Sequence, residues 1–233
     1  MKVLYGVQGT GNGHITRARA MSEELARLGI EVDFIFSGRD QKDYFDMACF
    51  GNYRAFPGLS FVAKNGKVSF LATYRNAQLM RLLKDIYTLD LSSYDLVLTD
   101  FEPITAWAAK RQGKPCIGVG HQYAFHYDIP KYTGDAIGTW IMSWFAPVSR
   151  GLGVHWHHFD QPILPPIIQH ADSQSGAMDD QVLVYLPFEN SEDVMEWLEG
   201  VPNYTFRMHC KDIEPGKYGN VEVFPFSREG FQK

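Results

Sequence analysis

The sequence predicts an α/β fold in which a parallel sheet carries helices on both faces, followed by the beginning of a second domain of the same kind. The chain opens with an apolar run that passes through a glycine-rich loop into a segment of helical periodicity. Short apolar runs then alternate with amphipathic segments, as in parallel sheets that are buried on both sides. The same alternation restarts after a proline-rich stretch near residue 161.

The loop after the first strand carries four glycines within eight residues and ends in a histidine. Glycine lets a backbone approach a ligand closely, and the start of the next helix offers unpaired N–H donors and a partial positive charge. Such a place suits a phosphate, a carboxylate or a polar sugar. We therefore predict that Gly11, Asn12 and Gly13 bind substrate, together with Arg17. His14 lies at the positive helix end, which favours the neutral imidazole that a general base needs.

Two better-known glycine motifs do not fit this loop. A dinucleotide-binding fingerprint would have a third glycine in place of His14, and the second strand ends in Ser37-Gly38-Arg39 with no acid to hold a ribose. The Gly-Lys-Ser/Thr of a phosphate-binding loop is absent as well. The alternative that the loop merely connects a strand to a helix stays open.

The following elements are predicted from periodicity and turn signals. Apolar residues at helical spacing over residues 15–28, closed by Gly29, predict a helix. Asn-Gly between two apolar runs predicts a hairpin within residues 57–70. An aromatic helix at residues 133–145 is either core or a lip that contacts a lipid-linked acceptor. The other predicted elements are strands at 30–36, 53–56, 96–99, 115–119 and 151–156, and helices at 41–49, at 74–89 with Leu79, Leu82, Leu83 and Ile86 inward, and from Pro103 onward.

Polar side chains follow two further strands. Asp100 and Glu102 come directly after one apolar strand, and His121 and Gln122 follow the next. Because the carboxyl ends of parallel strands lie at one edge of a sheet, where ligands bind in open α/β folds, we expect these side chains to meet His14. The alternative for both acids is that they cap the helix that begins near Pro103.

The composition of the chain indicates which kinds of partner and which cellular compartment to expect. The 233 residues are 45% hydrophobic and 21% charged, which is ordinary for a globular protein, and the formal net charge of -5 argues against nucleic acid as the main partner. Three widely separated cysteines favour a reducing compartment. With an apolar run at 137–148 that is too short to cross a bilayer and no signal-peptide pattern, we predict a cytoplasmic location, with the inner face of the membrane as the other possibility.

The pattern divides the chain into two domains. Residues 1–160 form the first, residues 161–180 read as a Pro-rich and polar linker, and residues 181–233 begin the second. A strand at 182–187, a helix at 191–198, and strands at 204–208 and 221–224 are expected there. About fifty residues cannot bury a full sheet, so we expect this second domain to be cut short.

The motifs above resemble those of the GT-B glycosyltransferases. Residues 9–14, Gly-Thr-Gly-Asn-Gly-His, are similar to the glycine-histidine loop of the N-acetylglucosamine transferase of peptidoglycan synthesis and related UDP-sugar transferases. The Asp-Phe-Glu-Pro exit at 100–103, the Gly-Lys-Pro strand entry at 113–115, the Leu-Pro-Pro linker at 164–166 and the strand at 182–187 look like those of an uncharacterised bacterial and archaeal subfamily. The resemblance spans the whole chain.

The resemblance implies two Rossmann-like domains, the first binding an acceptor and the second a nucleotide sugar. It implies transfer of a sugar from a UDP-linked donor to a hydroxyl of a glycan or a lipid-linked acceptor, with no cofactor or metal. His14 matches the family histidine and is the candidate base, while Asp100 or Glu102 would orient it or hold acceptor hydroxyls. The glycine-rich loop and acidic residue that the family's donor domain supplies are not found after Pro225. We therefore expect this chain to bind nucleotide sugar weakly and to transfer little by itself.

Three other functions are also compatible with the sequence. A non-hydrolysing UDP-sugar epimerase has a similar skeleton, and a module that binds a sugar or nucleotide without catalysis would suit a shortened second domain. A zinc hydrolase could use His155 and His157, which share one face if that segment is a strand, with His158 and Asp160 nearby. Spacing places no third ligand for that metal.

Overall fold

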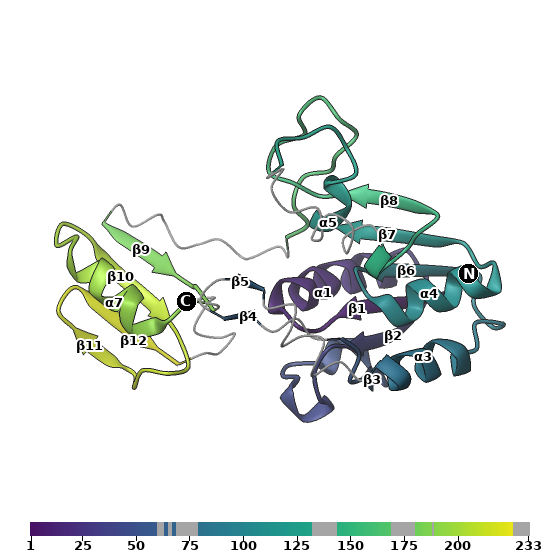
Figure 1. The fold of residues 1–233 in the computed structure, drawn as a ribbon, viewed down its shortest axis with the longest axis horizontal. Helices are drawn as coiled ribbons and strands as arrows, with labels where there is room; N and C mark the ends of the chain where they lie inside the picture. Colours follow the sequence, from purple (N-terminus) through teal and green to yellow (C-terminus); the bar gives the residue numbers. More distant parts are fainter. Residues whose placement is uncertain are drawn as a thin grey trace. The chain divides into compact units, whose positions relative to one another are not determined.

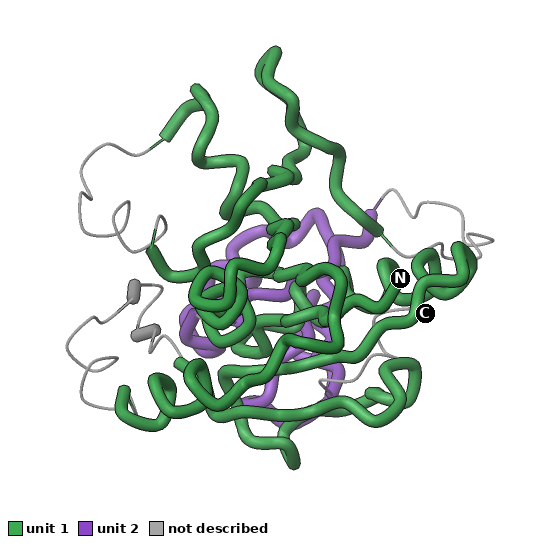
Figure 2. The backbone as a smooth tube through the Cα atoms, turned by 90° about the vertical axis from the view of Figure 1, so that its right-hand side faces the viewer, with its two compact units in different colours: residues 1–60, 74–170 green, residues 61–73, 171–233 purple. Residues whose placement is uncertain are grey.

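The computed structural model describes residues 1–59, 63–64, 67–68, 79–131, 144–168, 180–187 and 189–225. Its contacts divide the chain into two compact units (Figures 1 and 2). Unit 1 comprises Met1–Ser60 and Tyr74–His170, and unit 2 comprises Phe61–Thr73 and Ala171–Lys233. Each unit contains its own sheet and its own apolar core, so each is described by itself.

Unit 1 is built on a six-stranded sheet in the order β3-β2-β1-β6-β7-β8, and every neighbouring pair is parallel. The register aligns the carboxyl ends of the strands, with Gln8 opposite Ser37 and Val7 opposite Asp100. This is the Rossmann-like α/β fold that the sequence predicts. The strands are β1 Lys2–Gln8, β2 Glu31–Ser37, β3 Arg54–Phe56, β6 Leu96–Asp100, β7 Cys116–Gly120 and β8 Arg150–Gly153.

Helices cover both faces of this sheet because its strands are apolar on both sides. Tyr5 and Val7 point toward α1 (Asn12–Arg27), where Ile15 and Ala18 complete one core. Leu4 points the other way, into a core that contains side chains of α3 (Leu79–Thr88) and α4 (Pro103–Gln112). Helix α4 begins with proline at its first position and is followed by the C-cap Gly113, whose φ of 65° is the left-handed conformation that glycine adopts easily.

Several predicted elements differ from the observed ones. Residues 41–49 do not form one helix: they contain two 3-10 turns, η1 (Gln41–Asp43) and η2 (Ala48–Phe50). In α3, Leu82 and Ile86 are buried as predicted, whereas Leu79 and Leu83 are 42% and 47% exposed, so their predicted inward position is wrong. The buried stripe of α3 is narrow because this helix packs on the sheet along one side only.

The hairpin predicted within residues 57–70 is confirmed, since β4 (Ala63–Lys64) pairs antiparallel with β5 (Lys67–Val68). Most of the predicted aromatic helix, residues 133–143, lies outside the described residues, as do residues 74–78 of the predicted helix 74–89 and the polar stretch 169–179. No helix among the described residues is long and apolar enough to span a membrane.

Unit 2 contains a four-stranded sheet in the order β11-β12-β10-β9. Strands β9, β10 and β12 are parallel, and β11 is antiparallel to β12 across a turn at Gly219, whose φ is 58°. The predicted strands and helix are present, whereas β11 was not predicted because three residues give too short a pattern. The elements are β9 Gln181–Val184, α7 Ser191–Glu199, β10 Thr205–His209, β11 Gly216–Tyr218 and β12 Val221–Phe224.

The orientation of α3 can be tested with two neighbouring leucines. Leu82→Ala removes a buried side chain and is expected to lower the free energy of unfolding by about 2–4 kcal/mol. Leu83→Ala changes a half-exposed side chain and is expected to alter it by less than about 1 kcal/mol. Urea unfolding followed by circular dichroism measures both, and equal losses would contradict the observed orientation.

Candidate active site

The predicted loop lies at the carboxyl edge of the sheet in unit 1. Strand β1 ends at Gln8, Gly11 is the N-cap of α1, and His14 lies in the first helical turn. Gly11 has no side chain to cap the helix, and no acidic residue lies in that turn. The first amide groups of α1 therefore have no side-chain acceptor from the cap, which leaves the positive helix end available to a polar or anionic group.

The glycines of this loop differ in how much space surrounds them. A Cβ at Gly9 would lie 2.1 Å from Oη of Tyr44, so the close packing of the protein itself excludes a larger residue. A Cβ at Gly13 would meet no atom within 4 Å, and one at Gly11 would meet only the His14 ring at 3.9 Å. Packing therefore explains Gly9 but not Gly11 and Gly13, where the open space suits a close approach by a ligand.

His14 and Asp100 meet as predicted. Nδ1 of His14 lies 2.7 Å from Oδ1 of Asp100, the last residue of β6. Asp100 is completely buried, while the His14 side chain keeps 16% of its exposure. A carboxylate can only accept, so Nδ1 carries the proton that is donated to it. Nε2 is then the unprotonated ring nitrogen and can accept a proton, as in a general base oriented by a carboxylate.

Arg17, predicted to bind substrate, faces the same carboxylate. Its Nε donates to Oδ2 of Asp100 at 2.6 Å and its Nη2 donates to Oδ1 at 2.8 Å, a bidentate pair from one turn after His14. Burial acts to raise the pKa of Asp100, but the hydrogen bonds from His14 and Arg17 and the positive charge beside the carboxylate outweigh it and hold that pKa below its usual value. Asp100 is therefore ionised in the folded protein at neutral pH.

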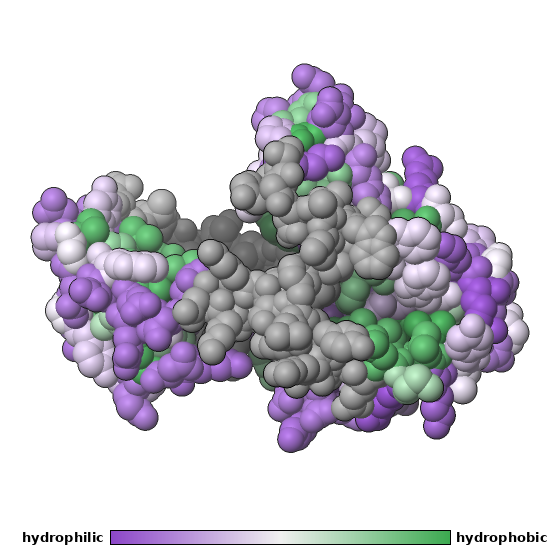
Figure 3. All heavy atoms as spheres, viewed as in Figure 1, coloured by the Kyte–Doolittle hydropathy of each residue, from purple (hydrophilic) through white to green (hydrophobic). Residues whose placement is uncertain are grey.

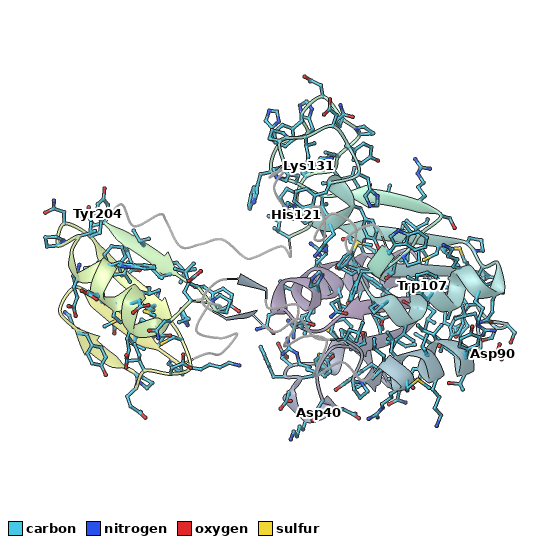
Figure 4. All side chains as sticks on the ribbon, viewed as in Figure 1. Asp40, Asp90, Trp107, His121, Lys131 and Tyr204 are labelled. Carbon is cyan, nitrogen blue, oxygen red and sulfur yellow. The ribbon has the colours of Figure 1, made fainter. Side chains whose placement is uncertain are left out.

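Two other elements complete the surroundings of His14. Nε2 of Gln122, in the short helix α5 (His121–Ala124), lies 3.5 Å from Nε2 of His14. The neighbouring His121 is exposed, its Nδ1 lies 3.3 Å from the Val154 carbonyl, and its ring stacks on that of His155 at 5.2 Å. Burial and the charges of His155 and Arg17 lower the pKa of His121 despite its backbone hydrogen bond, so this ring is neutral at pH 7. Figure 4 labels His121.

Glu102 does not join His14. It is the N-cap of α4, accepts from the backbone amides of Ile104 and Thr105 at 2.8 and 2.7 Å, and also accepts from the hydroxyls of Ser37 and Thr105 at 2.6 and 2.7 Å. Four donors occupy both carboxyl oxygens of this buried side chain. Burial raises the pKa of Glu102, although these hydrogen bonds oppose the shift. Capping, the alternative considered for both acids, thus describes Glu102 and not Asp100.

A backbone turn separates the two acids. Phe101, between them, has a φ of 55°, a left-handed conformation that is uncommon for a bulky residue. Its ring is buried and stacks on Phe145 with centroids 4.9 Å apart, which holds the turn in place. The turn sends the Asp100 side chain toward α1 and the Glu102 side chain onto the start of α4.

Arg39 was not predicted as a site residue. It follows β2 at the same edge of the sheet, and its guanidinium donates to the Gly9 carbonyl and, over 3.2 Å, to Oδ1 of Asn12. It also lies over the Tyr44 ring, 5.2 Å from the centroid. Arg39 thereby fixes the shape of the glycine loop. Its position after a strand exit was the available signal, because every strand of this sheet ends at that edge.

The histidine segment considered for zinc does not assemble a metal site. Throughout the described part of the chain, no group of three or more His, Cys, Asp or Glu side chains is placed to hold a metal ion. His155 and His157 lie after β8 in a segment of turns, where their ring nitrogens bond backbone groups of the same segment. The structure therefore gives the zinc alternative no support.

Comparisons with known proteins agree with this fold. The family model described as glycosyl transferase family 1 matches residues 1–136. UGT89C1 of Arabidopsis thaliana, solved in complex with UDP, superposes with a TM-score of 0.56 at 10% identity, covering 98% of this chain and 71% of its own. No curated protein sequence matches the chain.

Two further solved structures share this fold. The glycotransferase of kitacinnamycin has a TM-score of 0.55 at 14% identity and covers 95% of this chain and 70% of its own. MurG of Acinetobacter baumannii has a TM-score of 0.51 at 12% identity and covers 99% and 70%. At identities this low, the superpositions show the fold alone, which is the GT-B fold. The six-stranded sheet corresponds to its N-terminal domain.

The structural assignment of Glu102 predicts a loss of stability on its removal. Glu102→Ala leaves two backbone amides and two hydroxyls without their acceptor in a buried place, and is expected to lower the free energy of unfolding by about 3 kcal/mol. Glu102→Gln keeps one accepting oxygen and is expected to lose less. Urea unfolding measures both variants, and an alanine variant as stable as the parent chain would contradict the capping role.

Proposed function

The chain belongs to glycosyl transferase family 1, and on that premise we propose that it takes part in moving a sugar from a nucleotide-sugar donor to an acceptor hydroxyl. The observation that carries the proposal is the contact of 2.7 Å between Nδ1 of His14 and the buried Asp100 carboxylate. It leaves Nε2 as the accepting nitrogen of a ring that is partly exposed at the edge of the sheet.

In the proposed reaction, His14 is the general base and Asp100 its orienting partner. The acceptor oxygen attacks the anomeric carbon of the donor sugar, and Nε2 of His14 takes the hydroxyl proton. The bond between that carbon and the diphosphate breaks, and the diphosphate leaves with the electron pair. Asp100 holds the Nδ1–H form of the ring and stabilises the imidazolium that forms. Glu102 has no part in this step because its oxygens are occupied at the cap of α4.

We propose that the loop binds the donor near its diphosphate. Gly11, Asn12 and Gly13 lie at the start of α1, and the space beside Gly13 is open. Backbone amides at a helix start, together with room for close approach, suit a phosphate without a metal. A UDP-linked donor is supported by UGT89C1, which was solved with UDP and shares this fold. Gln122 and His121 are the proposed contacts to the acceptor, since Gln122 lies beside Nε2 of His14.

The division of labour between the two parts of the chain is also a proposal. Residues 1–160 would bind the acceptor, residues 161–180 would link, and residues 181–233 would belong to a domain that binds the nucleotide sugar. Unit 2 supports this through its three parallel strands, with α7 packed against the same core. The chain covers about 70% of the length of the similar solved structures, so an activity measured for whole glycosyltransferases is not assumed for these 233 residues.

A lipid-linked acceptor at a membrane surface is one form of this proposal. Helix α3 exposes Met80, Leu83 and Tyr87, by 81%, 47% and 66%. Figure 3 shows apolar side chains gathered in this part of unit 1. The Arg111 guanidinium lies over the Tyr87 ring, 5.3 Å from its centroid, which adds positive charge beside the apolar face. Apolar and cationic groups together favour contact with an anionic membrane surface.

Replacement of His14 tests the base. His14→Ala is expected to lower the rate of UDP release from UDP-hexoses with a glycan acceptor by about 10²–10⁴-fold, because general base catalysis contributes about that much. Donor affinity should change by less than about twofold, since no ground-state contact is lost. His158→Ala, which changes an exposed histidine of another segment, is the control. Undiminished turnover would refute the assignment of His14 as the base. An epimerised sugar as the only product would indicate that the protein is an epimerase.

Replacement of Gly13 tests donor binding by the loop. Gly13→Ala places a methyl group in open space within a helix, so stability should stay the same or rise by less than about 1 kcal/mol. Affinity for a UDP-sugar, measured by calorimetry, should fall at least about tenfold if the diphosphate approaches this position. Gly9→Ala should instead destabilise the protein through Tyr44. An alanine at position 13 that binds donor normally would exclude close approach there.

A further inference from the structure

Asp100 has two partners that can carry a positive charge, and only one of them is also the proposed base. We propose that Arg17 is a positioning residue that neutralises the buried Asp100 carboxylate, so that His14 can remain uncharged and ready to accept a proton at neutral pH. This inference rests on the function proposed above for His14. It gives Arg17 a role in catalysis that is distinct from contact with substrate.

Burial makes a cationic partner for Asp100 necessary. The carboxylate is 0% exposed, and an isolated charge in such a place is strongly unfavourable. Among the residues that the structure describes, His14 and Arg17 are the ones that bond its oxygens. A guanidinium stays protonated at every pH of interest, whereas an imidazole is charged only after it binds a second proton.

The geometry lets Arg17 fill this need without displacing His14. The planar guanidinium reaches both carboxyl oxygens, while His14 shares Oδ1 with Nη2 of Arg17. Nη2 and Nδ1 of His14 lie only 3.3 Å apart. Both nitrogens carry protons that point to the same oxygen, so they do not bond each other. A second proton on His14 would place a positive charge beside the guanidinium, and this repulsion favours the neutral ring.

Loss of Arg17 would reverse that preference. His14 would then be the one described partner able to balance the buried carboxylate, and it could do so only as the imidazolium. His14 would therefore hold the extra proton. The ionised carboxylate beside a neutral imidazole, which general base catalysis requires, would then be less populated at neutral pH.

Other groups face this cluster but do not replace Arg17. Tyr5 of β1 is completely buried, and burial and the Asp100 charge raise its pKa far above 10, so it stays neutral. His121 of α5 is neutral at pH 7 for the reasons given above. Gln122 carries no charge, and Arg39 approaches the loop through Asn12 and Gly9. The pKa of Arg17 is raised, since the hydrogen bonds and charge of Asp100 outweigh its burial.

The test follows the ring of His14 by nuclear magnetic resonance, with its signal assigned by the variant His14→Gln. In Arg17→Gln we expect the midpoint of the His14 titration to move up by about 1–2 pH units relative to the parent chain, the usual effect of losing a neighbouring charge. Arg27→Gln, which changes an exposed arginine of the same helix paired with Glu24, should leave the midpoint where it was. An unchanged midpoint in Arg17→Gln would overturn the proposal.

A second variant, Arg17→Lys, tests the proposal if Arg17→Gln does not fold. Arg17→Lys keeps the charge but reaches the carboxylate from a single nitrogen, so the midpoint should rise by a smaller amount. A midpoint that does not move in either variant refutes the inference. Because the titration needs no substrate, it is independent of the proposed function. Where turnover is found, the acid limb of the pH-rate profile should shift by the same amount as the midpoint. An acid limb that does not shift would show that Arg17 does not control the protonation of the catalytic base.

Discussion

The buried carboxylate of Asp100 is the constraint on which the candidate site depends. It is the last residue of the central strand β6, and its two oxygens receive donors from the first two turns of α1. A charge with no access to water must be paired, so this strand end and the start of this helix are tied together. The glycine loop between β1 and α1 is thereby held near the carboxyl edge of the sheet, and the His14 ring is held with Nδ1 on the carboxylate and Nε2 beside Gln122.

A second buried carboxylate, two residues along the chain, stabilises the scaffold beneath the site. Glu102 joins the start of α4 to Ser37 at the end of β2, and Ser37 in turn lies next to Gln8 at the end of β1. Gln8 donates to Oγ1 of Thr10 in the glycine loop at 2.5 Å. One short stretch of chain thus supplies an acid that orients a candidate base and an acid that caps a helix. The left-handed turn at Phe101 directs the Asp100 side chain toward α1 and the Glu102 side chain toward the start of α4.

The family assignment and the geometry support the same chemistry from different directions. The match over residues 1–136 covers the whole loop and both strand exits that carry the site. The superpositions establish the GT-B fold but, at 10–15% identity, say nothing of which sugar is moved. The residues around His14 supply what fold similarity cannot, namely an oriented imidazole, an ionised partner and open space beside the loop.

The sequence by itself determined the α/β class, the order of most strands and helices, and the importance of the glycine-histidine loop. Those features depend on local periodicity and on residues whose backbone preferences act over a few positions. It also indicated that His14 would meet Asp100, Glu102, His121 and Gln122, because parallel strands end at one edge, and Asp100 and Gln122 are the ones that lie against His14. Only the tertiary structure decided that Asp100 pairs with His14 while Glu102 caps α4, that Arg17 faces Asp100, and that Leu79 and Leu83 face solvent. The direction of a side chain depends on a single turn and on packing between segments that are distant in the chain, and neither leaves a periodic signal in the sequence.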